Sequence, residues 1–466
     1  MNKLKIINDP VYGFITIPYE IIFDLMEHPW FQRLRRINQL GLTHLVYPGA
    51  IHTRFHHALG ALHLMTKALD TLEQKGVELT AEEKEATCIA ILLHDIGHGP
   101  FSHVLENTIL PDIHHETISL ELMQLLNKEF KGRLNLAIEI FIDNYPKKFL
   151  HQLISSQLDM DRLDYLTRDS FYTGVSEGIV GIDRIISMLA VKDNELVVEE
   201  KGIYSIEKFI IARRLMYWQV YLHKTTLAAD TLITNIMRRA KELLAINYPL
   251  NTTDNLLYFL KLKSPIAVDS LLFEKFNKID DSDLILNIKQ WQECDDFVLS
   301  KLCKSLINRK LPKISIQNKP FDKSLIEERK SNALANIKDL NNSTIGYFVN
   351  TGTVKNEAYK TIGWIEKDKW GFEIRNDKNF DSSLINSDSR NHKNKISITQ
   401  LKLLGFKNRN GSDIVYEDKR EGWLIRPDGE DGPIYIVFDN YLRLLEWNRS
   451  LRFAITVGTL SDKIKI

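Results

Sequence analysis

The chain has 466 residues, of which 44% are hydrophobic and 26% are charged, and its 61 basic side chains balance its 61 acidic ones. This length supports a large core and more than one domain, while the zero net charge indicates no overall preference for nucleic acids or membranes. Three scattered cysteines exclude a disulfide framework, so we expect free thiols in a reducing compartment.

The amino-terminal segment has no signal-peptide pattern, and no segment has the roughly 18 successive apolar residues of a membrane span. We therefore expect a cytoplasmic protein without a membrane partner. Residues 1–20 are predicted to form extended segments and turns. Apolar residues then recur at helical spacing, which predicts helices over 19–40 (interrupted near Pro29), 56–75, 81–96, 115–130, 134–144, 147–170, 182–190 and 205–246.

Two features add detail to this helical part. Thr80 and Glu83 form a capping box before the helix 81–96, and glycines with a proline follow its end. A short hairpin is predicted between residues 195–199 and 202–204.

The pattern changes beyond residue 250. Helical spacing continues to about 310, and residues 313–316 begin a region of mixed strands and helices. We predict strands at 344–349, 360–365, 370–375 and 433–438, and a polar loop at 376–395. The expected fold is mainly α, with a core over 1–250, a helical extension over 251–310 and an α+β region of unknown role over 311–466.

Histidines are concentrated in one part of the chain, because eleven of the fourteen lie between His28 and His115. Histidine is the commonest metal ligand and the usual acid–base group near neutral pH, so this concentration indicates a site. The strongest local signal is an apolar helix that ends by presenting His94 beside Asp95. A neutral imidazole next to a carboxylate suits a divalent ion such as Mn, Fe, Co, Ni or Zn.

Two adjacent ligands do not close a metal site, so others must come from distant segments. His56 and His57 follow Arg54 at the start of one predicted helix. Further along, Asp161, Tyr165 and Asp169 recur every four residues and share one helix face. One carboxylate of this face is expected to bind the metal, although acids in such positions also serve as helix-end charges or salt-bridge partners.

The order of His57, the pair His94-Asp95 and Asp161 resembles the H…HD…D signature of the HD superfamily, whose members have an all-helical core. Within it, four segments resemble the deoxynucleoside triphosphate triphosphohydrolases, in the branch of the metazoan SAM-and-HD-domain enzyme and its smaller bacterial relatives: 31–41, 47–50, 54–60 and 94–103. The similarity continues through 159–169 and 221–224, and covers about residues 5–245. The C-terminal third shows no match, and there is no SAM domain.

The resemblance implies that His57, His94, Asp95 and Asp161 hold a divalent transition metal, with additional Mg on the nucleotide phosphates. Water would attack the α-phosphate of a deoxynucleoside triphosphate and release a deoxynucleoside and inorganic triphosphate. The family match assigns catalytic roles to three further residues. His115 would be the general acid, and Glu106, in place of the usual Asp, would orient it. His98 would lie above the phosphates.

The same match implies substrate contacts. The positions that bind phosphates are Arg54, His98, His103, Arg162, Tyr165 and Arg213. Arg162 stands where the metazoan enzyme has Lys, so a point charge is replaced by a bidentate fork. The positions that bind the sugar are Gln39, Tyr165, Asp169 and Tyr221, and the two tyrosines would leave little room for a 2′-hydroxyl.

A second nucleotide site is also implied. Asn8, Glu27, Gln32 and Arg35 stand where the family binds an activating guanine nucleotide between subunits, so a homo-oligomer, a dimer or a tetramer, is expected. Glu27 replaces an Asp of the family. The alternative is that Gln32 and Arg35 belong to a solvated helix face.

Two other functions remain open. A different HD phosphohydrolase, such as a nucleotidase or a cyclic-nucleotide phosphodiesterase, would need only the metal ligands. A nucleotide sensor or nucleic-acid-binding protein with little turnover is favoured slightly by residues 301–330, where nine basic side chains stand against three acidic ones. Such a run is usually a solvated face.

Overall fold

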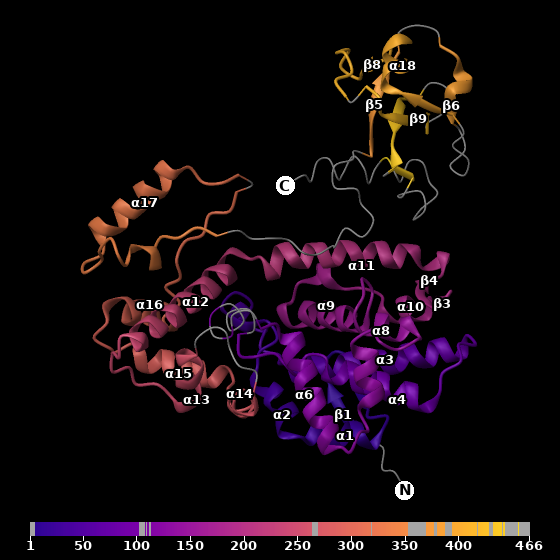
Figure 1. Cartoon of the computed structure of the whole chain (residues 1–466). Coiled ribbons are helices and arrows are strands. Elements are labelled where there is room, and N and C mark those ends of the chain that lie inside the picture. Colours follow the sequence, from indigo (N-terminus) through magenta and orange to yellow (C-terminus); the bar gives the residue numbers. More distant parts are fainter. Residues whose placement is uncertain are drawn as a thin grey trace. The chain divides into compact units, whose positions relative to one another are not determined.

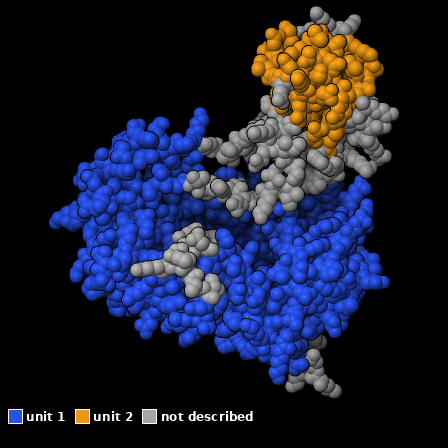
Figure 2. All heavy atoms as spheres, viewed as in Figure 1, with its two compact units in different colours: residues 1–359 blue, residues 360–466 orange. Residues whose placement is uncertain are grey.

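The computed structural model describes residues 5–101, 108, 110, 113–262, 269–317, 319–352, 370–376, 380–386, 394–416, 418–427, 432–439, 441–442 and 455. Two compact units, Met1–Tyr359 and Lys360–Ile466, make up the chain (Figures 1 and 2). The first unit is built mostly of helices and the second contains a sheet, so the predicted mainly α fold with an α+β C-terminal region is confirmed. The predicted domain boundaries at 250 and 310 stay predictions.

The first unit begins with a hairpin and four short helical segments: β1 (Ile6–Asp9), β2 (Gly13–Thr16), α1 (Glu20–Glu27), α2 (Pro29–Gln32), η1 (Arg33–Arg36) and η2 (Gly41–Leu45). The predicted interruption near Pro29 of the helical stretch 19–40 is confirmed, but the part after it consists of two short segments and ends at Arg36. His28 precedes a proline and is extended, with ψ 135°, which ends α1. Its ring then accepts a hydrogen bond from the Trp30 amide at 3.3 Å and so caps α2.

The next helices include those that carry the candidate site residues: α3 (Arg54–Gln74), α4 (Ala81–Leu93), α6 (His115–Glu129), α7 (Asn135–Phe141), α8 (Lys148–Ile154), α9 (Met160–Thr173) and α10 (Ile182–Ser187). The predicted capping box of Thr80 and Glu83 begins α4. This helix ends at Leu93, three residues before the predicted end. The helix predicted over 147–170 is two helices, because Ser155 is extended and Asp159 caps α9 by accepting from the Arg162 amide at 2.7 Å.

The next segments are the hairpin of β3 (Leu189–Lys192) and β4 (Glu195–Val198), two 3-10 turns at Ser176–Gly178 and Glu200–Gly202, and helices α11 (Ile203–Met216) and α12 (Lys224–Ala245). The predicted pairing of 195–199 with 202–204 is wrong, since the preceding strand is the partner and Ile203 already begins α11. The predicted helix 205–246 is interrupted by a π-helical turn at Tyr217–Tyr221.

The rest of the first unit is helical: α13 (Asp254–Lys261), α14 (Ser270–Phe276), α15 (Asp281–Trp291), α16 (Phe297–Ile307), α17 (Lys323–Asn336) and the 3-10 helix Ile345–Tyr347. The strand predicted at 344–349 is thus wrong: Ile345 and Tyr347 are buried on a helical turn, where Asn235 of α12 donates to the Tyr347 carbonyl. Residues 313–316 have no regular structure. Among the described residues, no helix is both long and apolar enough to cross a membrane.

The second unit contains a six-stranded sheet in the order β6-β9-β10-β5-β8, with β7 beside β9. Its elements are β5 (Gly371–Arg375), a 3-10 turn (Ser382–Leu384), β6 (Ile385–Asn386), β7 (Lys395–Ser397), α18 (Ile398–Leu403), β8 (Lys407–Asn408), β9 (Glu421–Ile425) and β10 (Ile434–Val437). The strands predicted at 370–375 and 433–438 are confirmed as β5 and β10. The one predicted at 360–365 lies outside the described residues. The predicted loop 376–395 includes β6, which pairs in parallel with β9.

Gly60 lies at the contact between α3 and α9. A Cβ atom at this position would lie 1.9 Å from Asp164 Oδ1 and 2.1 Å from Arg168 Nη2. Only a residue without a side chain allows the two helices to approach this far. This approach places the first turn of α3, with His57, against the first turn of α9, with Asp161.

We predict that Gly60→Ala lowers the free energy of unfolding by about 1–3 kcal/mol, because the added methyl group overpacks the contact between α3 and α9. Chemical denaturation measures this change. Gly181→Ala is the matched control, since a Cβ there meets no atom within 4 Å. Equal stabilities of the two variants would contradict the role given to Gly60.

Candidate metal centre

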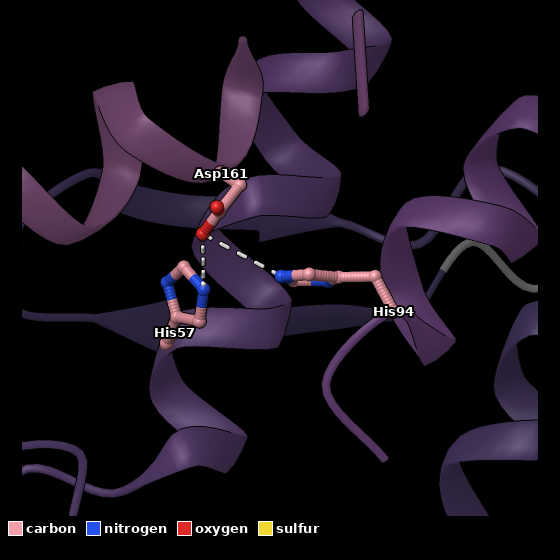
Figure 3. Close-up of side chains that lie close together, drawn as sticks. All are labelled: His57, His94 and Asp161. Carbon is pink, nitrogen blue, oxygen red and sulfur yellow. Dashed lines mark ion pairs between the residues drawn. The ribbon is translucent and has the colours of Figure 1, made fainter. Parts of the chain in front are cut away.

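The four predicted metal ligands lie close together, and Figure 3 shows three of them, His57, His94 and Asp161. His57 comes from α3, His94 and Asp95 directly follow α4, and Asp161 comes from α9. Asp161 Oδ1 lies 3.1 Å from His57 Nε2 and 3.5 Å from His94 Nε2. Asp95 Oδ1 lies 3.3 Å from His94 Nε2, and its Oδ2 lies 3.7 Å from His57 Nε2. The structure thus places two imidazoles and two carboxylates around a common centre.

Contacts at the Nδ1 atoms fix the orientation of both imidazoles. His57 Nδ1 lies 2.7 Å from Asp164 Oδ2, and His94 Nδ1 lies 2.6 Å from the Ile91 carbonyl oxygen. An acceptor at each Nδ1 assigns the proton to that nitrogen and directs Nε2 to the centre. Asp164 does not appear among the predicted site residues, although it lies within the segment 159–169.

The donor set fits a divalent transition metal. The Nε2 atoms of His57 and His94 are buried and face the Asp161 carboxylate, but among the described residues neither makes a well-directed hydrogen bond. Burying such atoms unpaired is costly, whereas coordination to a metal would satisfy both. Two imidazole nitrogens and two carboxylates suit the borderline ions predicted from the sequence, Mn, Fe, Co, Ni or Zn.

The charges around these imidazoles also favour a cation. Burial lowers the pKa of His57, but its contacts with Asp161 and Asp164 outweigh this and raise the pKa to about 10. Burial raises the pKa of Asp161, yet His57 and His94 hold it well below its usual range. Without a metal, protons on the imidazoles therefore balance the carboxylates, and metal binding would release them.

A second group of potential ligands shares Asp95. Asp95, His98 and His115 place one donor atom each within 4.8 Å of one another. His98 Nε2 lies 3.2 Å from Asp95 Oδ1, and its ring stacks on that of His115 at 3.8 Å. Burial and the charge of Arg54 lower the pKa of His98 to about 3, so this ring is neutral. The other two predicted residues of this region, His103 and Glu106, lie outside the described residues.

The turn that follows α4 is held by residues that the sequence reasoning missed. Arg33 is fully buried and donates to the carbonyls of Ile96 at 3.0 Å and His98 at 2.8 Å. Ser119 of α6 accepts from the Gly97 amide at 2.9 Å and donates to the His94 carbonyl at 2.7 Å. Arg33 lies within the segment 31–41, whose resemblance to the family was the signal in the sequence that could have identified it.

The predicted phosphate-binding cations come from three different helices. Arg54 is buried and pairs with Asp95 at 2.6 Å. Arg162 pairs with Asp159, and Arg213 is buried on α11. Burial raises the pKa of Tyr165, while the charges of Arg213 and Arg162 oppose the shift. The ring of Tyr165 therefore lies within reach of the charges of both arginines.

Two of the predicted sugar-binding residues, Asp169 and Tyr221, are hydrogen-bonded to each other, and His52 contacts the same carboxylate. Asp169 Oδ1 lies 2.7 Å from His52 Nε2, and its Oδ2 accepts from the Tyr221 hydroxyl at 2.7 Å. The rings of Tyr165 and Tyr221 meet edge to face at 6.3 Å. The Gln39 side-chain oxygen is buried and finds no hydrogen-bond partner within the part of the chain that the structure describes. His52 was not predicted as a site residue, although it belongs to the concentration of histidines between His28 and His115.

The residues predicted for a second nucleotide site lie at the surface. Asn8 on β1, Glu27 at the end of α1 and Arg35 are exposed. Gln32 accepts from Arg35 Nε at 2.8 Å and donates to the Met26 carbonyl at 2.7 Å. These contacts are local, and the role of the four residues stays a prediction.

Comparison with known families matches residues 54–169 to the HD domain and residues 180–264 to the HD associated region. Residues 358–462 match the transglycosylase SLT domain. In the described part of this last segment we find a mixed sheet with one helix, α18, and we assign no activity to it.

Known proteins resemble this chain over half to three quarters of its length. The uncharacterized protein YwfO of Bacillus subtilis is 36% identical over 318 residues, which are 67% of this chain and 72% of that protein. A Dictyostelium discoideum protein named deoxynucleoside triphosphate triphosphohydrolase SAMHD1 homolog is 30% identical over 52% of this chain and 51% of its own. The crystal structure of a phosphohydrolase from Bacteroides thetaiotaomicron has 50% identity and a TM-score of 0.72, with 74% of this chain and 86% of that chain covered.

We predict that Asp161→Ala abolishes stoichiometric metal binding, because it removes the carboxylate that faces both imidazoles. The side chain is 26% exposed, so its loss leaves no closed cavity and the fold should persist. Metal content after dialysis, with circular dichroism as the folding check, tests this. Asp70→Ala, at an acid of α3 that is 51% exposed, is the control. Wild-type metal content in Asp161→Ala would refute the ligand assignment.

Proposed function

Because the chain belongs to the HD-domain phosphohydrolase family, a family of metal-dependent enzymes, we propose that it hydrolyses deoxynucleoside triphosphates to deoxynucleosides and inorganic triphosphate. One observation carries this choice of substrate. Asp161, Tyr165 and Asp169 lie on one face of α9, so a metal ligand, an aromatic ring and a carboxylate follow one another. They span about 12 Å along the helix, which leaves room for a sugar phosphate between the metal centre and Asp169.

The metal centre supplies the phosphate end of this site. A divalent ion held by His57, His94, Asp95 and Asp161 would polarise a phosphate oxygen and lower the pKa of a water molecule. His115, stacked on the neutral His98, is the proposed general acid that protonates the leaving 5′-oxygen. This assignment follows the family resemblance, as does that of Glu106 as its orienting residue.

The charges of a triphosphate require several cations. Arg54, Arg162 and Arg213 supply three, and guanidinium groups bind phosphate oxygens in bidentate fashion. The Dictyostelium relative, which is named as a triphosphohydrolase, supports this substrate over a simple monophosphate ester.

The sugar end is formed by Asp169 and the tyrosines. With one oxygen near His52 and the other bound to Tyr221, the Asp169 carboxylate is fixed in place to accept a hydrogen bond from a 3′-hydroxyl. The neighbouring rings of Tyr165 and Tyr221 would restrict space at the 2′-position, which favours a deoxyribose. His98 and His103 are proposed to contact the phosphates, and Gln39 the sugar.

Activity is proposed to depend on assembly. A guanine nucleotide would bind at Asn8, Glu27, Gln32 and Arg35 between subunits of a homo-oligomer. The exposure of Asn8, Glu27 and Arg35 supports this proposal, since an intersubunit ligand requires accessible side chains.

We expect purified protein with Mn²⁺ or Mg²⁺ to convert deoxynucleoside triphosphates to deoxynucleosides and triphosphate. In ¹⁸O-labelled water the label should enter triphosphate and not the deoxynucleoside, because attack at the α-phosphorus breaks its bond to the 5′-oxygen. Mass spectrometry of both products measures this, and Asp161→Ala is the inactive control. Release of pyrophosphate and monophosphate, or turnover of cyclic nucleotides alone, would contradict the proposal.

We further expect GTP to increase the rate of dATP hydrolysis and to shift the protein to a larger species in analytical ultracentrifugation. Glu27→Gln should weaken both responses, because it removes the charge predicted to recognise guanine. Asp24→Asn, at an exposed acid of the same helix, should leave them intact. A rate and an oligomeric state that are both indifferent to GTP would rule out the second site.

A further inference from the structure

A chain of buried ion pairs runs from the metal centre to the amino-terminal hairpin. His57 Nδ1 lies 2.7 Å from Asp164 Oδ2, and Asp164 accepts from Arg168 Nε and Nη2, both at 3.0 Å. Arg168 Nη1 then donates to Asp9 Oδ2 at 2.7 Å. The side chains of His57, Asp164 and Arg168 are 0% exposed and that of Asp9 is 2% exposed. We call these four residues the relay.

Asp9 belongs both to the relay and to the hairpin. It is the last residue of β1 and faces Gly13 of β2. Its Oδ1 accepts from the backbone amides of Val11 and Tyr12, each at 2.9 Å, so this carboxylate also shapes the turn. Because one rigid group makes both sets of contacts, a displacement of the hairpin moves the acceptor of Arg168.

The middle residues of the relay, Arg168 and Asp164, each contact two partners. The loss of a contact at Asp9 therefore alters the contacts of His57 at the other end. Arg168 divides its donors between Asp9 and Asp164, and Asp164 divides its oxygens between Arg168 and His57. If Asp9 no longer accepts a hydrogen bond, the buried guanidinium of Arg168 loses one of its two carboxylate partners. Its interaction with the other partner, Asp164, then becomes stronger. Asp164 then becomes a weaker acceptor for His57, and the outer partner of a metal-binding imidazole tunes its affinity for the metal.

We propose that Asp9 is a positioning residue for the metal centre, and that the β1–β2 hairpin and metal binding at His57 are energetically coupled through the relay. Metal binding stabilises the hairpin, and displacement of the hairpin weakens metal binding by the same factor. The coupling rests on the metal site of the proposed function and not on the choice of substrate.

The variant Asp9→Asn separates the two roles of this residue. The amide retains an oxygen for the Val11 and Tyr12 N–H groups, but its nitrogen does not accept from Arg168. Asp296→Asn is the matched control. Asp296 also accepts a backbone amide, that of Leu299 at 2.8 Å, and also binds an arginine, Arg239, at 2.6 and 3.1 Å. It belongs to the contact between α12 and α16 rather than to the relay.

The first test measures Mn²⁺ affinity of the full-length chain after chelator treatment, from the paramagnetic resonance signal of free Mn²⁺. Asp9→Asn should bind Mn²⁺ about tenfold more weakly than wild type, the lower end of the range for outer-sphere partners. Asp296→Asn should bind as wild type does. Unchanged affinity in Asp9→Asn would overturn the proposal, and so would equal weakening in both variants, since that indicates general destabilisation.

The second test needs no variant to fold. Hydrogen exchange of the amides in residues 6–16 of the wild-type protein should slow when Mn²⁺ is added at saturation, and the slowing should be lost in Asp9→Asn if that variant folds. An exchange rate in the wild-type hairpin that ignores Mn²⁺ would overturn the coupling. Neither test uses a nucleotide, so failure of the proposed substrate would be seen separately.

Discussion

Three carboxylates lie around two buried imidazoles in this protein, and negative charges this close are stable together only when positive charge lies among them. Asp95 and Asp161 face the centre, while Asp164 lies behind His57. The surrounding structure supplies the positive charge in two ways. Arg54 and Arg168 neutralise Asp95 and Asp164 from outside, and a divalent ion would neutralise the inner pair. The rest of the first unit is arranged to hold these groups in position.

The helices contribute to this arrangement mainly through their ends. His57 and Asp161 lie in first turns, and His94 follows a last turn, so side chains from three helices converge where regular backbone structure begins or stops. Residues without large side chains then allow the close approach. At Gly60, the missing side chain leaves space for Asp164 and Arg168 of α9. At Gly97, it leaves space for the first turn of α6, because a Cβ atom there would lie 2.3 Å from the His115 carbonyl oxygen. The close packing of the helices at these two glycines therefore also brings the charged groups of the metal centre together.

Much of this was predictable from the sequence, because the signals are local. Helical periodicity, the capping box at Thr80 and the apolar helix before His94 each depend on neighbouring residues. Two of the errors also had local signals, which helical periodicity alone does not record. The break at Ser155 is marked by the cap at Asp159, and the hairpin of β3 with β4 by its two-residue turn Asp193-Asn194, where both φ angles are positive. The relay from Asp9 to His57 was missed because it depends on tertiary packing, since 159 residues separate Asp9 from Arg168. The predicted substrate residues came from the family resemblance, and the geometry adds the contacts around them.

The π-helical turn at Tyr217–Tyr221 constrains the chain through its length rather than its composition. Such a turn contains one residue more than the α-helix around it, and each residue of an α-helix advances the phase by about 100°. Removing one residue from this turn before Tyr221 would rotate Tyr221 relative to α11 and take its hydroxyl away from Asp169, while the extended His223 would still separate the turn from α12. The length of this segment is therefore constrained independently of its side chains, because a single deletion would break the hydrogen bond between Tyr221 and Asp169.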